Sequence, residues 1–273
     1  MTGAAFSAGF IVGPALSALL APLGPRFPFF AAAGLAAMNA MFGLFVLKES
    51  LAKENRRKFE WWRANPLGAL HALGRFPMIL SLCAVIVLMR LAHDANPVIF
   101  TYYVMYAFNW SQQMVGYSLM AVGAMMIVVY SFLIRLVIPR IGEANAVYLG
   151  LMFGAIGFAG YAFSTQGWMI FAWMLPFSLM GFAMPGLNAI MSKIVGPSEQ
   201  GELQGALSCI GSLTSIAAPP LLTNIFGYFT SPAAPVQFPG AAFLTASICL
   251  LLAAIVFTGI RARATVSATT AAE

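Results

Sequence analysis

Residues 47–75 read LKESLAKENRRKFEWWRANPLGALHALGR and form the one long polar segment of a very apolar sequence. Half of the 14 Lys and Arg residues of the chain lie in this segment. Lys and Arg close to the ends of membrane spans resist translocation, so a loop this basic stays on the cytoplasmic side of a membrane. The segment therefore predicts the orientation of everything on either side of it.

The composition excludes an ordinary soluble domain. The chain is 61% hydrophobic and only 8% charged, with a mean hydropathy of +0.87, whereas soluble domains carry roughly 25% charged residues. Apolar runs of about 20 residues, the length that crosses a bilayer as helix, recur along the sequence. We predict an all-α, polytopic membrane protein. Its net charge of +6 lies in loops between spans, which membrane topology explains without a nucleic-acid partner.

Two apolar spans precede the basic segment and six follow it. The eight expected transmembrane helices are about 4–23, 27–47, 77–108, 114–138, 146–163, 168–191, 203–229 and 241–260. The predicted organisation is thus the end of an N-terminal half at 1–47, a basic cytoplasmic loop at 48–76, a six-helix C-terminal half at 77–260, and a disordered cytoplasmic tail at 261–273. Many transporters have two six-helix halves, so a segment carrying four further N-terminal helices is an expected partner.

The remaining positive charges agree with this topology. With the basic loop inside, alternate crossings place Arg135, Arg140, Lys193 and the Arg261 region inside too. Arg26 alone falls outside and Arg90 lies within a span. An incorrect number of spans would distribute these positive charges over both sides of the membrane.

Three ionisable side chains form a cluster within the third span. Arg90, His93 and Asp94 share one helix face because they are three and four residues apart. Charges at membrane depth are costly and face a cavity or a partner. The functional interpretation makes Asp94 a proton carrier, with Arg90 as its partner and His93 as a titratable neighbour; the alternative is an Arg90–Asp94 pair that only stabilises packing. Asn96 follows on the substrate path, and Pro97 predicts a break in the helix.

Small residues form a second feature in the first span. Gly9 and Gly13 share a helix face that lets another helix approach closely, and Pro14 bends the helix. From the residues alone this indicates helix packing. The sequence around them, GFIVGPALSA at 9–18, resembles the antiporter signature G-x-x-x-G-P-x-x-G-G of proton-coupled drug exporters in the major facilitator superfamily, which implies a role in gating or preventing leaks.

Further stretches are similar to the tetracycline-resistance branch of that superfamily. They are GPRFPFF at 24–30, NPL at 65–67, WS at 110–111, GWM at 167–169 and QGELQG at 200–205. By this resemblance the chain runs from the fifth to the twelfth helix of the family. Arg140 and Gly142 keep part of the family's cytoplasmic loop motif, with Pro139 where an acid is usual. The family's acidic residue in the ninth helix has no counterpart at 151–157.

The resemblance implies proton-coupled efflux of small hydrophobic molecules, such as tetracycline-like antibiotics, through a bacterial inner membrane. The expected partners are the lipid bilayer, protons and a small-molecule substrate. The alternative is a truncated or accessory membrane protein with no transport activity of its own. The sequence has no nucleophile paired with a base, no metal-ligand spacing and no phosphate-binding loop, so we predict no enzyme activity, cofactor or metal.

Overall fold

The computed structural model describes residues 9, 12, 13, 16, 20, 24, 26–47, 77–196 and 199–270, with backbone alone at 77 and 262–270. It divides into two compact units, Met1–Lys58 and Phe59–Glu273. The described part of the first unit is mainly helix α2, Phe27–Phe45, which is apolar and has no buried residue. The expected span at 4–23 and the basic segment lie largely or wholly outside the described residues.

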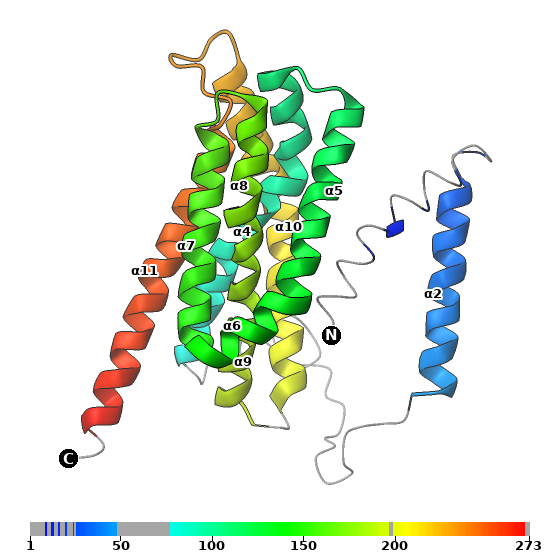
Figure 1. Ribbon diagram of the computed structural model, residues 1–273. Helices are drawn as coiled ribbons and strands as arrows, with labels where there is room; N and C mark the ends of the chain where they lie inside the picture. The colour runs from blue at the N-terminus through cyan, green and yellow to red at the C-terminus, as the bar shows by residue number, and fades with distance from the viewer. Residues whose placement is uncertain are drawn as a thin grey trace. The chain divides into compact units, whose positions relative to one another are not determined.

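The second unit is a bundle of long helices (Figure 1). Three of them are α4 (Pro77–Phe108), α7 (Glu143–Ala162) and α10 (Gln200–Thr230). A fourth, α11, runs from Ala241 to Thr270. Across the described residues, seven helices including α2 are long and apolar enough to cross a membrane. Eight spans were expected, and the one at 4–23 lies largely outside the described residues. The seven helices match the other seven expected spans, which confirms the predicted all-α membrane architecture.

The two other spans of this unit each contain a turn that is not α-helical. One consists of α5 (Gln112–Val128), the π-helical turn η3 (Val129–Leu133) and α6 (Ile134–Ile141). The other consists of α8 (Gly167–Leu179), the 3-10 turn η4 (Met180–Phe182) and α9 (Ala183–Ile194). The two turns contact each other. Such irregular turns frequently occur at functional sites.

Local sequence explains where helices begin. Ser111 precedes α5 in an extended conformation, and its hydroxyl accepts a hydrogen bond from the Met114 amide at 3.2 Å, as an N-cap residue does. Gly142 separates α6 from α7 with φ +79° and ψ 161°. That combination is essentially restricted to glycine, so the tight connection between these two spans depends on this residue.

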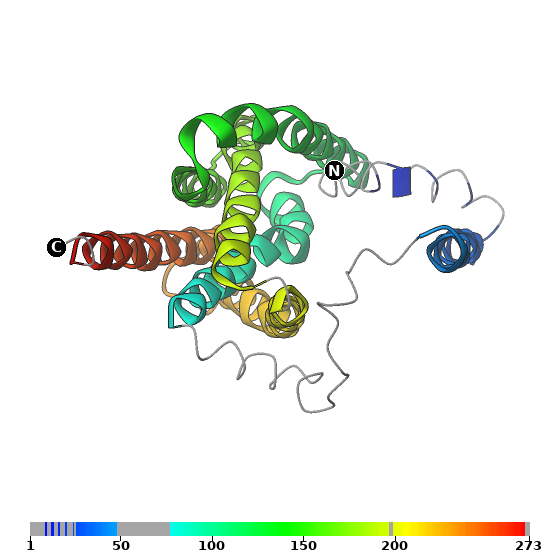
Figure 2. The ribbon, with the colours of Figure 1, turned by 90° about the horizontal axis from the view of Figure 1, so that it is seen from below.

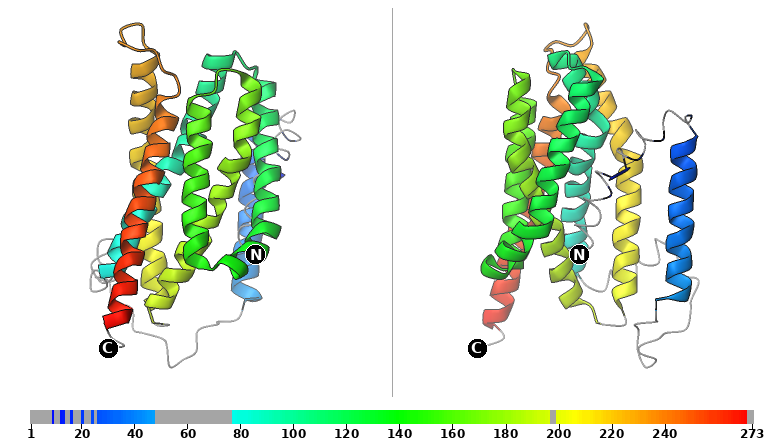
Figure 3. Two further views of the ribbon diagram at one scale, coloured as in Figure 1. Left: turned by 60° about the vertical axis from the view of Figure 1, so that its left-hand side comes forward. Right: turned by 45° about the vertical axis from the view of Figure 1, so that its right-hand side comes forward.

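Helix α4 is central to the bundle. It packs against α10 on one side and α11 on another, while α7 packs against α11, α8 and α9, and α5 packs against α8. The side views show the long helices running in roughly the same direction, and the view from below shows α4 next to α10 and α11 (Figures 2 and 3). The ionisable cluster predicted in the third span therefore lies on a helix with neighbours on several sides.

A row of glycines on α7 permits very close helix packing. A Cβ added at Gly150 would lie 2.6 Å from the Ala183 backbone nitrogen, and one at Gly157 would lie 2.6 Å from that of Phe177. A Cβ added at Gly154 would meet the side chains of Met180 and Leu250 instead, and one at Gly160 the Trp173 ring. Small residues at this spacing allow backbones to approach within a membrane. The glycines thus place η4 and both helices that flank it directly against α7.

An aromatic cluster shared by α4, α7, α8 and α11 forms part of the core. Tyr103, Phe158, Tyr161, Phe177 and Phe243 are at most 2% exposed, and their ring centroids lie 5.0 to 6.3 Å apart. The Tyr103 hydroxyl donates a hydrogen bond of 2.6 Å to the Tyr161 carbonyl. The buried Tyr103 hydroxyl of α4 is therefore hydrogen-bonded to the backbone of α7.

Two local predictions were wrong. Pro97 does not break the third span, because α4 continues through it to Phe108; neighbouring helices and local adjustment let membrane helices tolerate proline. The tail is not disordered between 261 and 270, because α11 continues to Thr270. Residues 261–270 contain no glycine or proline, so nothing in the local sequence ends the helix there.

Candidate functional site

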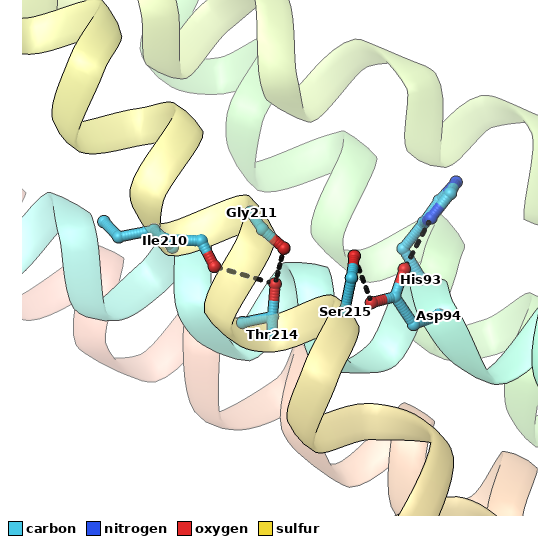
Figure 4. A network of polar contacts seen from close by, with 6 residues as sticks. All are labelled: His93, Asp94, Ile210, Gly211, Thr214 and Ser215. Carbon is cyan, nitrogen blue, oxygen red and sulfur yellow. Dashed lines mark hydrogen bonds and ion pairs between the residues drawn. The ribbon is translucent and has the colours of Figure 1, made fainter. Parts of the chain in front are cut away.

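The predicted ionisable cluster lies on α4 where this helix faces α10. The Asp94 Oδ1 atom is 3.6 Å from His93 Nδ1, and Asp94 Oδ2 accepts a hydrogen bond of 3.5 Å from the Ser215 hydroxyl of α10. Figure 4 shows the carboxylate between the imidazole and the serine. The structure thus brings together two of the predicted residues and a serine from a distant span.

Both contacts of the Asp94 carboxylate are long. Hydrogen bonds to an ionised carboxylate usually measure about 2.7–2.9 Å from a charged nitrogen donor and about 2.5–2.7 Å from a hydroxyl. The contacts of Asp94 are 3.6 Å to the His93 nitrogen and 3.5 Å to the Ser215 hydroxyl. The Asp94 side chain is 14% exposed and the His93 side chain 42%. The carboxylate is therefore mostly removed from solvent, and its two contacts are long.

The neighbouring residue of α10 has a different environment. The Thr214 side chain is buried, and its hydroxyl donates to the Ile210 and Gly211 carbonyls of its own helix, both at 2.9 Å (Figure 4). Its hydrogen-bonding capacity is satisfied within α10. Ser215, one residue further, is the group that reaches α4.

The expected Arg90–Asp94 pair is not among the ion pairs of the described residues, which are His93 with Asp94 and Lys193 with Glu143. The Asp94 carboxylate contacts α10 instead, and the half-buried Arg90 guanidinium interacts electrostatically with Tyr130 of η3. A spacing of four residues permits a pair, but the hydrogen bond of the Asp94 carboxylate comes from α10.

Asn96 and His93 each contain a buried polar atom without a hydrogen-bond partner among the described residues. The atoms are the Asn96 amide oxygen and His93 Nδ1. Buried polar groups are nearly always paired with protein or ordered water. Two such atoms within two residues of Asp94 in the chain make this part of α4 unusually polar for a membrane span.

Sequence reasoning missed Ser215. An exposed polar row on α10, spaced by three or four residues, could have indicated it: Gln204, Ser208, Ser212 and Ser215. The hydroxyls of Ser208 and Ser212 donate to carbonyls one turn earlier in α10. The row is therefore an accessible polar stripe that ends beside Asp94.

The predicted loop motif lies between α6 and α7, at the end of the bundle for which the charge pattern predicts a cytoplasmic location. Arg140 donates to the Leu136 carbonyl of its own helix at 3.2 Å, and Gly142 forms the turn into α7. Two other polar contacts at this end join different spans. They are Glu143 with Lys193 of α9 at 2.6 Å, and Asn145 with Arg261 of α11 at 2.7 Å.

The antiporter motif belongs to the first unit. Gly9 and Gly13 are helical and exposed, with nothing within 4 Å of an added Cβ. Pro14 lies outside the described residues. The role of this glycine face in packing or gating stays a prediction.

Within the described ranges, no group of three or more His, Cys, Asp and Glu residues could hold a metal ion.

Similarity to known proteins agrees with this architecture. The Major Facilitator Superfamily model matches residues 1–219. The class C tetracycline resistance protein of Escherichia coli is 32% identical over 83% of this chain and 57% of its own length. The class G protein of Vibrio anguillarum is 33% identical over 82% of this chain and 57% of its own length.

The fold also resembles a solved transporter structure. The crystal structure of the human organic anion transporter MFSD10 aligns with a TM-score of 0.78 and 22% identity over 93% of this chain and 62% of that protein. This likeness shows the fold alone. The chain spans a little over half the length of the tetracycline resistance proteins it matches. It belongs to the Major Facilitator Superfamily, a family of membrane transporters and not of enzymes.

Proposed function

We propose that the protein carries out proton-coupled efflux of small hydrophobic molecules across a bacterial inner membrane. Tetracycline-like compounds are the first substrates to test, because 83% of this chain aligns with a tetracycline resistance protein at 32% identity. The observation that carries the coupling part of the proposal is the weakly held Asp94 carboxylate at the contact between α4 and α10.

Protonation of Asp94 would change the contact between these two helices. The ionised carboxylate accepts a charge-assisted hydrogen bond from Ser215, which is roughly twice as strong as the bond that a neutral acid would make. Removing the charge also lowers the cost of enclosing this residue at membrane depth. A substrate-loaded and a proton-loaded state can therefore differ in how closely α4 and α10 pack, which is the coupling that an antiporter requires.

The test is efflux driven by a proton gradient in inverted membrane vesicles. It compares the wild-type chain with Asp94→Asn, each also expressed with any coding sequence in frame ahead of Met1. Asn keeps the size of the side chain but carries no exchangeable charge, so we expect pH-dependent accumulation of tetracycline to disappear while membrane abundance stays normal. Ser215→Ala is the matched variant, because it removes the contact but leaves the carboxyl group.

Abundance in the membrane is measured by immunoblot for every variant. The described residues show no ion pair between Asp94 and Arg90. The Asp94→Asn substitution therefore does not deprive Arg90 of a partner, and we expect this variant to fold normally. Normal pH-dependent efflux by Asp94→Asn would show that the coupling group lies elsewhere. A lack of efflux by every form, including wild type, would favour the accessory membrane protein.

A further inference from the structure

Helices α4 and α10 contact each other through side chains at two levels. At the first level, here called the carboxylate contact, Asp94 accepts the hydrogen bond of 3.5 Å from Ser215. At the second level, here called the tyrosine clamp, the Tyr106 hydroxyl donates to the Thr230 carbonyl at 3.3 Å, and the Tyr106 ring meets Phe226 edge to face with centroids 6.1 Å apart. Asp94 and Tyr106 are twelve residues apart on α4, which is about 18 Å along a helix.

Prolines weaken both helices between these two levels. Pro97 lies inside α4, and Pro219 and Pro220 lie inside α10. Proline has no backbone N–H and therefore removes the helical hydrogen bond to the carbonyl four residues earlier. Those carbonyls include the ones of His93 and Ser215, so helical bonds are missing where each helix leaves the carboxylate contact. Both helices can bend most easily at this place.

The tyrosine clamp lies at the better anchored end of α10. The Phe238 amide of the link to α11 donates to the Phe229 carbonyl of α10 at 3.0 Å, and the Phe238 ring centroid lies 5.6 Å from that of Phe163 after α7. The last turn of α10 is thus fixed by the link as well as by Tyr106. The carboxylate contact, in comparison, depends on a long bond that is stronger while the carboxylate is charged.

We propose that Tyr106 is a positioning residue for coupling, which holds the C-terminal ends of α4 and α10 together while the two helices part at Asp94 and Ser215. The inference rests on the proposed function, because loss of the Asp94 charge is the event that weakens the carboxylate contact. Helix shifts in switching proteins are about 1–2 Å. A shift of about 2 Å at Asp94 is a rotation of only about 6° about the clamp, which an edge-to-face ring contact tolerates because such pairs occur over a range of centroid separations.

The test measures two distances between nitroxide spin labels by electron paramagnetic resonance, in the full chain held in nanodiscs. The contact pair, Leu91→Cys with Ser212→Cys, lies one turn before the carboxylate contact. The clamp pair, Met105→Cys with Gly227→Cys, lies at the tyrosine clamp. The labels must react with introduced cysteines alone, so the native cysteines are first replaced by alanine at Cys83, Cys209 and Cys249.

The carboxylate contact is weakened from each helix in turn, with all samples at one pH so that His93 does not change its protonation. Asp94→Asn removes the charge and should lengthen the distance in the contact pair by about 2 Å, while the distance in the clamp pair stays as in the parent protein. Ser215→Ala should have the same effect. When Tyr106→Ala is added to Asp94→Asn, both distances should lengthen, whereas Tyr106→Phe keeps the ring contact and should leave the clamp pair close.

Two further variants serve as controls. Tyr102→Ala removes a tyrosine one turn earlier on α4, which is 63% exposed against 50% for Tyr106, and should change neither distance. Pro219→Ala lets a helical hydrogen bond form again, so it should reduce the lengthening that Asp94→Asn causes. An unchanged contact pair in Asp94→Asn, equal lengthening of both pairs while Tyr106 is present, or a Tyr106→Ala variant that behaves like Tyr102→Ala would overturn the proposal.

Label distances require no transport, which separates this proposal from the proposed function. A chain whose contact pair lengthens while its clamp pair stays close, but which moves no substrate, supports the clamp and counts against efflux. A chain that drives proton-coupled efflux of tetracycline while both pairs lengthen together supports efflux and overturns the clamp.

Discussion

Gly157→Ala should destabilise the protein because α7 touches α8 directly at this point. The added methyl carbon would lie 2.6 Å from the Phe177 backbone nitrogen and 2.7 Å from its Cα atom. Because these are backbone atoms, no side-chain rotation can relieve the contact, and α8 as a whole has to move. Introducing one methyl group into a packed core costs about 1–3 kcal/mol, and backbone contact favours the upper end of that range.

The intrinsic preference of alanine for helix opposes this cost. Replacing glycine by alanine within a helix gains about 0.8–1.0 kcal/mol, so the expected net loss is about 2 kcal/mol. For a chain of this size the loss lowers the melting temperature by about 4–8 °C. The measurement is thermal unfolding of the purified protein in detergent, followed by the fluorescence of a dye that reacts with newly exposed cysteines.

Gly259→Ala is the matched control, because nothing lies within 4 Å of a Cβ at Gly259 of α11. It should leave the melting temperature unchanged or raise it slightly. If Gly157→Ala melts at the wild-type temperature, the two helices are not packed backbone to backbone. If both variants lose the same stability, the effect does not come from contact with α8.

Three other outcomes are expected. Tyr103→Phe should lower the free energy of unfolding by about 0.5–1.5 kcal/mol, because it removes a hydrogen bond between spans; an unchanged denaturation midpoint would contradict this. Gly142→Ala should cost about 1–3 kcal/mol, since alanine is strained at this backbone geometry, and a wild-type melting temperature would show that the turn adapts. Fluorescent-protein fusions after Arg263 should be bright and alkaline phosphatase fusions inactive, and the reverse would invert the proposed topology.

Apolar length and turn residues were sufficient to predict most spans. The expected span at 146–163 is helix Glu143–Ala162 in the structure, and the expected span at 168–191 lies within Gly167–Ile194. Differences are confined to the ends, where polar residues such as Glu143 extend a helix beyond its apolar core. The irregular turn at 180–182 within the second of these spans has no signal in hydropathy, because the residues there are as apolar as those around them.

Local rules failed where a neighbouring helix decides the outcome. Pro97 reads as a helix breaker, yet α4 continues through it, because a membrane helix packed on several sides can tolerate one lost hydrogen bond. The glycines of α7 were visible in the sequence at intervals of three and four residues. Their partners on α8, η4 and α9 could not be named, since spacing along one helix defines a face but not what packs against it.

The sequence by itself determined the class of the protein, its spans and the position of its ionisable residues, because hydrophobic length and charge are properties of each segment alone. It also placed Arg90, His93 and Asp94 on one helix, since the helical repeat depends only on residue number. Only the tertiary structure decided which groups meet, such as Asp94 with Ser215 of α10. The physical reason is that a side chain at membrane depth must find its polar partner on whichever helix packs beside it.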